Sequence, residues 1–387
     1  MKAIFVGRFQ PFHKGHLRVV KEILKREKEI LIFIGSQQEF FTKKNPFNFR
    51  ERKEILKRVF LKEKLKGIKI FGVPDFLDDK LWAKKVLKIG KIEKRNAIVF
   101  TQNPWVKRCF EQIGVKVKEH PLFFGISATK IREKIAKKEK WEDLVPCPTR
   151  DYLKKINGEE RIRELFILPE EKIINFIKER ANLIGAKGGI IEVSENINWI
   201  VLGFLAKKIF KNILFLSIHF EKKPILNERF LEKELKIKIK KIQFKNILKS
   251  LLKELPKPKN TLLDFLKRTL KIATFYYFGK LKNFLILRPE DKTDLKLEKF
   301  NNFESSKREI LPLNFLYKTQ VIEMVERLNF SSKIIKLYKE KIYEKNLGLN
   351  FFQIDTILKL FAQNFSKKEI SFLTEVSQKK IEKILCK

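Results

Sequence analysis

The chain has 387 residues, 44% of them hydrophobic, which is enough for two domains that each bury a core. Its 86 Lys and Arg residues against 46 Asp and Glu give a formal net charge of +40. The basic residues are spread along the chain, which favours a solvated surface over a nucleic-acid-binding stripe. The sequence contains no signal peptide, no apolar run of about 18 residues, and no metal-ligand or disulfide spacing among its three cysteines. We therefore expect a cytoplasmic protein without a membrane span.

The first 140 residues alternate short apolar runs with amphipathic stretches. This alternation predicts strands at 2–7, 29–35, 67–73 and 96–102, and helices at 14–27, 50–64, 79–88 and 104–113. Continuous apolar strands between helices are typical of a parallel sheet that is covered on both faces. Ligands of such sheets bind at the carboxyl ends of the strands, and the polar clusters of this region follow strands.

The alternation resumes after a proline-containing stretch at 145–150 and a turn at 156–161. It predicts helices at 171–183 and 199–210, strands at 188–194 and 212–218, and later helices at 261–281, at 317–329 and from 332 onward. The charged segment 221–260 is interpreted as a loose connection. The fold class is therefore α/β, with two Rossmann-like parallel-sheet domains at 1–165 and 166–387. The second has a largely helical C-terminal part.

The stretch GRFQPFHKGH, residues 7–16, follows the first predicted strand and contains two of the four histidines of the chain. Gly7 and Gly15 would let backbone N–H groups approach phosphates closely. His13 and His16, three residues apart at the start of a helix, can direct their rings at one anion. Arg8 adds a positive charge.

The segment ISATKIREKI, residues 126–135, predicts a second anion-binding helix start. Ser127 and Thr129 are placed as N-cap and first-turn donors, and Arg132 can reach the same triphosphate. Lys130 lies nearby in the sequence. Ser127 could instead serve as a helix cap alone. The two segments together predict a nucleoside triphosphate site without a Walker loop.

These segments resemble the HxGH and ISxTxIR signatures of the nucleotidylyltransferase superfamily. Over residues 1–165 the chain resembles the archaeal-type nicotinamide-nucleotide adenylyltransferases in six blocks. In chain order these are GRFQPFHKGHL, IGSQQEFFTKKNPFNFRER, PDFLDDKLW, TQNPWVKRCF, ISATKIREKI and INGEERIREL. The family's Ser-His is Phe40-Phe41 here, and Arg50 replaces a glycine. We interpret Arg50 as a solvated charge. The loop HPLFFG before Ser127 is shorter than in the family.

The resemblance implies adenylyl transfer from ATP to nicotinamide mononucleotide by in-line attack, with Mg²⁺ as cofactor and no covalent intermediate. His13, His16 and Arg132 would be the catalytic residues. ATP-binding roles would fall to Gly7, Arg8, Gly15, Ser127, Thr129 and Arg52. The resemblance assigns no metal ligand.

The resemblance also implies a pyridine-nucleotide site formed by Asp75, Trp82 and Asn103. Trp82 could equally be a core aromatic residue, and Asp75 a turn residue after a proline. We interpret His120 and His219, the other two histidines, as structural.

Most of 170–360 resembles the ammonia-dependent NAD synthetases, but their catalytic blocks are altered. The family's Ser-Gly-Gly-Ile-Asp-Ser loop is Ser194-Glu195-Asn196-Ile197-Asn198-Trp199 here, so Glu195 would repel a phosphate and Trp199 replaces a small hydroxyl donor. A Gly-Thr block is Arg288-Pro289, only Asp294 remains of an acidic metal-binding block, and a further loop has become FNNFES at 300–305. We expect a catalytically degenerate scaffold that forms a homo-oligomer.

Three functions remain open at this point. The first is an adenylyltransferase with a degenerate partner domain. The second is a bifunctional enzyme that also amidates deamido-NAD. The third is a nucleic-acid-binding protein with a nucleotide-sensing domain. The sequence decides neither the amide or acid form of the substrate nor the oligomeric state.

Overall fold

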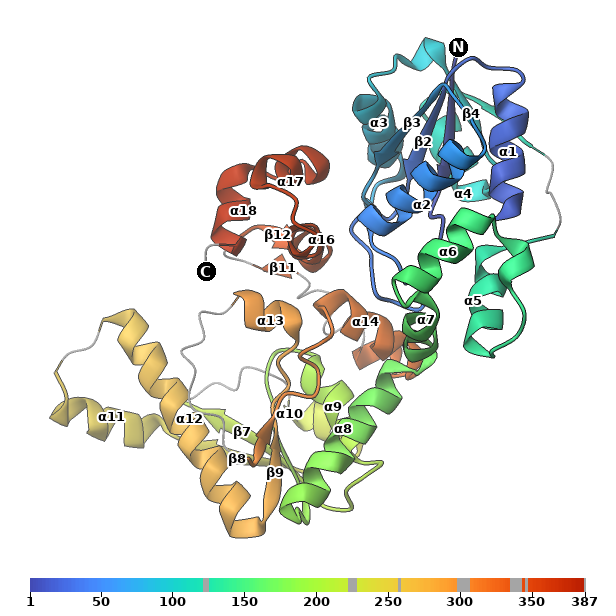
Figure 1. Ribbon diagram of the computed structural model, residues 1–387. Coiled ribbons are helices and arrows are strands. Elements are labelled where there is room, and N and C mark those ends of the chain that lie inside the picture. Colours follow the sequence, from blue (N-terminus) through green and yellow to red (C-terminus); the bar gives the residue numbers. More distant parts are fainter. Residues whose placement is uncertain are drawn as a thin grey trace. The chain divides into compact units, whose positions relative to one another are not determined.

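The computed structural model describes residues 1–120, 125–221, 228–256, 259–297, 307–334, 343–344 and 347–385 (Figure 1). They form two compact units. The first unit contains Met1–Ile167 and Thr356–Glu382, and the second contains Leu168–Asp355 and Lys383–Lys387. Within the described ranges, no helix is long and apolar enough to cross a membrane. The sequence-based division instead assigned every residue from 166 onward to the second domain.

The first unit is built on a five-stranded sheet in the order β3-β2-β1-β4-β5, with every pair parallel. Its strands are β1 (Lys2–Gly7), β2 (Ile30–Ile34), β3 (Ile68–Gly72), β4 (Ala97–Phe100) and β5 (Lys116–Lys118). Its helices within 1–167 are α1 (Lys14–Leu24), α2 (Phe49–Lys62), α3 (Asp79–Gly90), α4 (Pro104–Glu111), α5 (Ala128–Ala136), α6 (Cys147–Lys155) and α7 (Gly158–Phe166). Apolar side chains pack on both faces of this sheet in two buried clusters, which explains why β2 and β4 are apolar throughout.

The second unit repeats this strand order in a sheet arranged β10-β9-β6-β7-β8, again with parallel pairs. Its strands are β6 (Gly188–Glu192), β7 (Ile213–His219), β8 (Ile239–Gln243), β9 (Phe284–Leu287) and β10 (Glu309–Ile310). Its helices include α8 (Pro169–Ile184), α9 (Asn198–Ala206), α10 (Glu228–Leu235), α11 (Lys245–Glu254), α12 (Asn260–Lys282), α13 (Lys292–Leu297) and α14 (Lys318–Arg327). The short hairpin of β11 (Tyr343–Glu344) and β12 (Leu349–Asn350) precedes α16 (Phe351–Ala362), α17 (Lys367–Thr374) and α18 (Gln378–Leu385).

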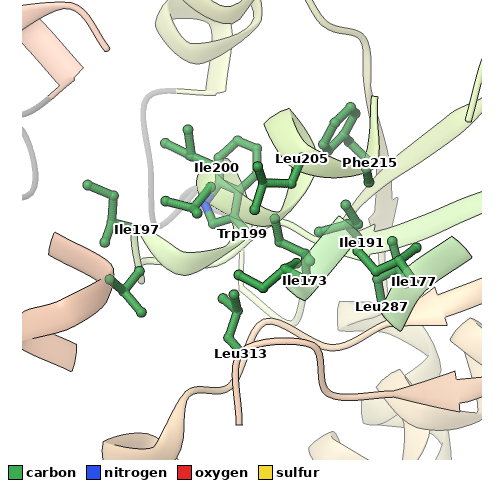
Figure 2. Close-up of a cluster of buried hydrophobic side chains, with 14 of the residues drawn as sticks. Ile173, Ile177, Ile191, Ile197, Trp199, Ile200, Leu205, Phe215, Leu287 and Leu313 are labelled. Atoms are coloured by element: carbon green, nitrogen blue, oxygen red, sulfur yellow. The ribbon is translucent and has the colours of Figure 1, made fainter. Parts of the chain in front are cut away.

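The core of the second unit surrounds the indole of Trp199, which is completely buried beside Ile173, Leu205 and Phe215 (Figure 2). Its ring meets Phe215 edge-on at 5.9 Å between centroids. Its Nε1 donates to the carbonyl of Ser194 at 3.0 Å, so the one polar atom of the indole is satisfied. The residue that replaces a small hydroxyl donor is thus a core residue.

Two segments interpreted as irregular are regular. The stretch with prolines near 146 begins α6, whose first turn contains a proline, because proline fits the first turn of a helix where its missing N–H has no partner. The supposed loose connection at 221–260 contains α10, β8 and α11 in its described part. Strand β8 is an edge strand with lysines on its exposed positions, a pattern that protects an open edge.

Candidate active site

Strands β1 and β4 are neighbours at the point where the strand order of the first sheet reverses, and β1 leads directly to α1. A side chain at Gly7 would place its Cβ 2.7 Å from the ring of Phe9, so only glycine allows this turn to pack as it does. Phe9 adopts a positive φ of 51°. Gly15 is buried in the first turn of α1. This compact turn brings the start of α1 to the carboxyl end of β1, which is where such sheets bind ligands.

His13 and His16 cap the N-terminus of α1 reciprocally. The Nδ1 of His13 accepts the N–H of His16 at 3.3 Å, and the Nδ1 of His16 accepts the N–H of His13 at the same distance. The rings stack with their centroids 3.6 Å apart. Because both Nδ1 atoms accept, each neutral ring must carry its proton on Nε2, which makes Nε2–H a donor.

Burial keeps both rings neutral at pH 7. It lowers the pKa of His13 to about 4. It lowers the pKa of His16 well below the usual value, and His13 and His120 lower it further. His120, which we interpreted as structural, is therefore an electrostatic neighbour of His16, and its ring also meets Phe5 edge-on at 5.9 Å. No motif around His120 in the sequence signals this proximity.

Two of the three predicted arginines of the site are buried. Arg132 donates to the carbonyls of Gln10 at 2.8 Å and Lys43 at 3.1 Å, and to the hydroxyl of Thr129 at 3.2 Å. Burial, together with the nearby charge of Arg8, lowers its pKa to about 10. Arg8 itself is exposed. Arg132 therefore remains charged at neutral pH beside Arg8, which creates a positive field next to the histidine pair.

Arg52 occupies a different environment from the one that we expected. Its side chain is completely buried, and its guanidinium donates to the carbonyls of Asn48, Arg8, Gly35 and Ser36. Burial lowers its pKa to about 9, which still leaves the group charged at neutral pH. With its N–H groups directed at three segments of backbone, this arginine holds the loops after β1 and β2 together. The geometry favours that positioning over direct contact with a phosphate.

The second predicted anion-binding segment begins α5. The Oγ of Ser127 accepts the N–H of Lys130 at 3.2 Å, so the residue is the N-cap. Thr129 is exposed in the first turn. Residues 121–124 of the loop before this helix lie outside the described part of the chain.

The predicted pyridine-nucleotide residues follow β3 and β4. Asp75 accepts from the hydroxyl of Ser36 at 3.1 Å and from the side-chain amide of Gln38 at 2.9 Å. Burial raises the pKa of its carboxyl group despite these two hydrogen bonds. Asn103 is the exposed N-cap of α4, with its Oδ1 accepting the N–H groups of Trp105 and Val106. Ser36 and Gln38, which the sequence interpretation did not single out, thus hold a candidate site residue.

Trp82 lies in the core of the first unit, only 1% exposed. Its ring centroid is 4.6 Å from that of Trp105, which is itself half-buried, and its Nε1 has no partner within the described residues. The structure therefore pairs Trp82 with Trp105, and a stack of Trp82 on a pyridine ring remains a prediction.

The phenylalanines that replace the family's Ser-His contact each other, with Phe40 and Phe41 edge-on at 5.1 Å between centroids. The ring of Phe41 lies 4.7 Å from the guanidinium of Arg161 in α7. Arg161 also pairs with Glu51 at 2.8 Å. Phe41 thus packs against Arg161, the partner of Glu51, where the family has a polar side chain.

Strand β6 is central in the second sheet, as β1 is in the first. Polar side chains gather around the loop that follows β6. Lys318 is 3% exposed, and its ammonium lies 2.8 Å from a carboxylate oxygen of both Asp291 and Asp294. Asn198 accepts from this ammonium at 3.2 Å and donates to both carboxylates at 3.0 Å. Asn196 donates to Asp294 at 2.8 Å. The carboxylate that remains of the acidic block is therefore already bound by a lysine and two asparagines.

A cavity of about 650 Å³ lies beside this network. Seven carboxylates line it against four Lys and Arg residues, in a chain whose net charge is +40. Arg288, which replaces the family's Gly-Thr block, pairs there with Glu290 at 2.5 Å and with Glu309 at 2.9 Å. This lining disfavours a polyanionic ligand. The altered loop at 300–305 lies outside the described residues.

Comparison with known proteins assigns both halves. The Cytidylyltransferase-like family matches residues 4–134, and the NAD synthase family matches residues 170–386. A nicotinamide-nucleotide adenylyltransferase of Saccharolobus solfataricus is 39% identical over 169 residues, which cover 42% of this chain and 96% of that relative. One of Thermoplasma acidophilum is 37% identical over 172 residues, which cover 44% of this chain and 94% of the relative.

Among solved structures, an NH₃-dependent NAD synthetase from Campylobacter jejuni aligns with a TM-score of 0.43 and 21% identity, covering 56% of this chain and 94% of that one. The family match of the second half spans more than half of the chain, and the first half covers nearly the whole length of its relatives. The chain belongs to the nicotinamide-nucleotide adenylyltransferases through its first half and to the NAD synthase family through its second.

Proposed function

We propose that this protein transfers the adenylyl group of ATP to the 5′-phosphate of nicotinamide mononucleotide, giving NAD and pyrophosphate. The observation that carries the proposal is the reciprocal cap of His13 and His16, which leaves two Nε2–H donors at the start of α1. The positive end of the helix and the charges of Arg8 and Arg132 add to the attraction of phosphate.

The reaction follows from these groups. The mononucleotide phosphate is already an anion, so it can attack the α-phosphorus in line without a general base. Negative charge then develops on the oxygens of the transferring phosphoryl group, where fixed N–H donors and arginines stabilise it. Arg132 would act beside the histidines, and Ser127 and Thr129 would donate to the remaining phosphate oxygens.

The cofactor would be Mg²⁺. Within the described residues no three His, Cys, Asp or Glu side chains gather into a metal site. An ion held through the triphosphate and water fits this lining, because Mg²⁺ keeps several of its waters when it binds nucleotides. It would neutralise phosphate charge, and the chain's own residues would orient the reactants.

The mononucleotide would lie near Asp75, which follows β3, and Asn103, which follows β4. The ends of these strands lie at the same edge of the sheet as the histidine pair. Asp75 is held by Ser36 and Gln38, so its carboxyl group is fixed before a ligand arrives. A fixed acceptor of this kind suits the amide group of nicotinamide, which the acid form lacks. We therefore expect the amide mononucleotide to be the better substrate.

For the second half we propose a scaffold without synthetase activity, which serves in a homo-oligomer. The buried Lys318 network and the acidic cavity support this reading over amidation of deamido-NAD. The match to the NAD synthase family covers residues 170–386 and does not by itself favour the bifunctional alternative.

The experiment supplies the full-length protein with ATP, Mg²⁺ and either the amide or the acid mononucleotide. We expect one pyrophosphate for each dinucleotide, faster turnover of the amide, and no exchange of pyrophosphate into ATP without a mononucleotide, because no adenylylated protein forms. Exchange in the absence of mononucleotide would contradict direct transfer. Failure to form either dinucleotide would contradict the proposed function.

A further inference from the structure

Residues Thr356–Glu382 follow the second unit in sequence and lie inside the stretch that matches the NAD synthase family, yet they pack as part of the first unit. They comprise the end of α16, α17 and most of α18. The first unit therefore has a part that comes from the far end of the chain. Its contacts reach two elements of the proposed mononucleotide site.

The first contact is made by Gln363, which is 6% exposed. Its side-chain Nε2 donates to the carbonyls of Gln37 and Gln38, both at 3.1 Å. Its Oε1 accepts the N–H of Phe49 at 3.1 Å. Phe49 is the first residue of α2, where a backbone N–H has no partner inside the helix, so this amide depends on Gln363.

Other residues of the segment strengthen the same contact. The ammonium of Lys359 lies 2.7 Å from the carboxylate of Glu39, with only 7% of the lysine side chain exposed. The ring of Phe365 lies 6.0 Å from that of Phe49. Arg50 reaches the carbonyl of Asn364 at 3.5 Å. The arginine that replaces a family glycine, interpreted from sequence as a solvated charge, is thus a neighbour of this segment.

The second contact is on α3, the helix that carries Trp82. The side chain of Lys85 is fully buried, and its ammonium donates to the carbonyl of Phe372 and pairs with Glu375 at 3.2 Å. Its ammonium also lies 4.5 Å from the centre of the Phe372 ring. This buried lysine, which the segment pairs with a carboxylate and a carbonyl, ties α3 to the segment.

Residues 36–39 form a short loop after β2 that these contacts hold from one side. On its other side the loop holds Asp75, through the hydroxyl of Ser36 and the side-chain amide of Gln38. Arg52 fixes the start of the loop through the carbonyls of Gly35 and Ser36. Loss of the Gln363 hydrogen bonds would therefore disturb the position of Asp75 before that of the histidine pair.

We propose that Gln363, supported by Lys359, is a positioning residue of the adenylyltransferase site: it fixes the 36–39 loop and through it Asp75, and so sets the affinity for the pyridine mononucleotide. The proposal rests on the proposed function for its substrate. The second half of the chain thereby contributes to the catalysis of the first without a catalytic residue of its own.

The test uses three full-length variants. Gln363→Met removes the donor and the acceptor while keeping the size of the side chain. Gln363→Glu keeps an acceptor for Phe49 but turns a carboxylate oxygen toward the two loop carbonyls. Gln378→Met makes the same chemical change at an exposed position of the same segment and is the matched control.

For Gln363→Met and Gln363→Glu we expect KM for the mononucleotide to rise about tenfold, the size of one buried hydrogen bond, with KM for ATP and kcat within about threefold. Amide exchange over residues 36–39 should accelerate in both, whereas that of Phe49 should accelerate in Gln363→Met alone. Gln378→Met should change none of these quantities. A merely structural role would raise both KM values together.

Unchanged amide exchange at 36–39 and Phe49 in Gln363→Met overturns the inference, whatever the activity. Equal rises of both KM values, with exchange accelerated, overturn the link to the mononucleotide. Wild-type protein that makes no dinucleotide overturns the proposed function instead, so the two failures are distinguishable.

Discussion

The two units present the same sheet topology with opposite polar chemistry at the corresponding edge. In each, the central strand is followed by a helix at the reversal of strand order. In the first unit, the start of that helix carries two neutral imidazole donors near arginines. In the second, Lys318, Asn198 and two aspartates satisfy one another at the same place. The comparison teaches that a fold can be retained while its own side chains occupy the place where the corresponding fold would bind a ligand.

The electrostatic energy of adding an anion differs between the two sites and explains which of them tolerates a phosphate. Bringing an anion to the first site adds negative charge where the chain supplies donors and arginines. Bringing one to the second site would add it to a cavity in which seven carboxylates face four Lys and Arg residues.

The largest expected effect is on the filled site of the second unit. Lys318→Met leaves Asp291, which is fully buried and whose pKa burial raises to about 6, facing Asp294 without a cation. Breaking a buried pair in this way costs about 3–5 kcal/mol of unfolding free energy. Scanning calorimetry should record the lower stability. Lys296→Met, at an exposed position of α13, is the control and should be nearly neutral.

The second largest effect is expected for His16, a donor of the first site. His16→Ala should lower kcat by about 10²–10³, the usual effect of removing one donor to a developing charge, with a smaller change in ATP affinity. His16→Asn can still accept the N–H of His13, so an equal loss in that variant separates the donor from the cap. Turnover within about twofold of wild type in either variant would exclude His16 from the mechanism.

The cap also links stability to pH. His13 has a lowered pKa of about 4 in the folded state against about 6.5 when unfolded, so the unfolded chain binds more protons between these values. Its contribution is present above pH 6.5 and is lost as the pH falls toward 4, by about 2–3 kcal/mol between pH 7 and 4.5. Urea unfolding should reveal this loss. His13→Asn, which can still cap the helix, should remove that part of the pH dependence, and an unchanged profile would contradict the neutral, buried ring.

The smallest effect concerns Trp82. If the pyridine ring stacks on it, Trp82→Phe should raise KM for the mononucleotide several-fold more than KM for ATP, while the aromatic packing against Trp105 is largely kept. Steady-state kinetics with each substrate varied would measure the split. Parallel changes in the two constants would assign Trp82 to the core, where the structure places it.

Sequence patterns predicted most of the sheet because apolar runs such as β2 and β4 are continuous and lie between helices. They failed where the same local sequence feature is compatible with two different structures. The prolines near 146 suggested a break but begin α6, and the lysines of β8 suggested a loop but protect a sheet edge.

The site was predicted in part for a similar reason. His13, His16 and Ser127 act within one turn of chain, so their spacing reveals the caps that the structure has. Arg52 and Gln363 act through backbone carbonyls of distant segments, and Gln363 lies 314 residues from Phe49 in sequence. No local pattern encodes such partners.

The most direct measurement of the central claim compares two reactions in one preparation of the full-length protein. One mixture holds ATP, Mg²⁺ and nicotinamide mononucleotide, and the other holds ATP, Mg²⁺, ammonium and deamido-NAD, with NAD followed in both by enzymatic cycling. We predict NAD in the first mixture and none in the second, and none after Glu195→Gly, because the Lys318 network and Arg288 remain. Amidation above about 0.1 s⁻¹, well below the usual 1–10³ s⁻¹ of enzymes, would contradict a filled second site.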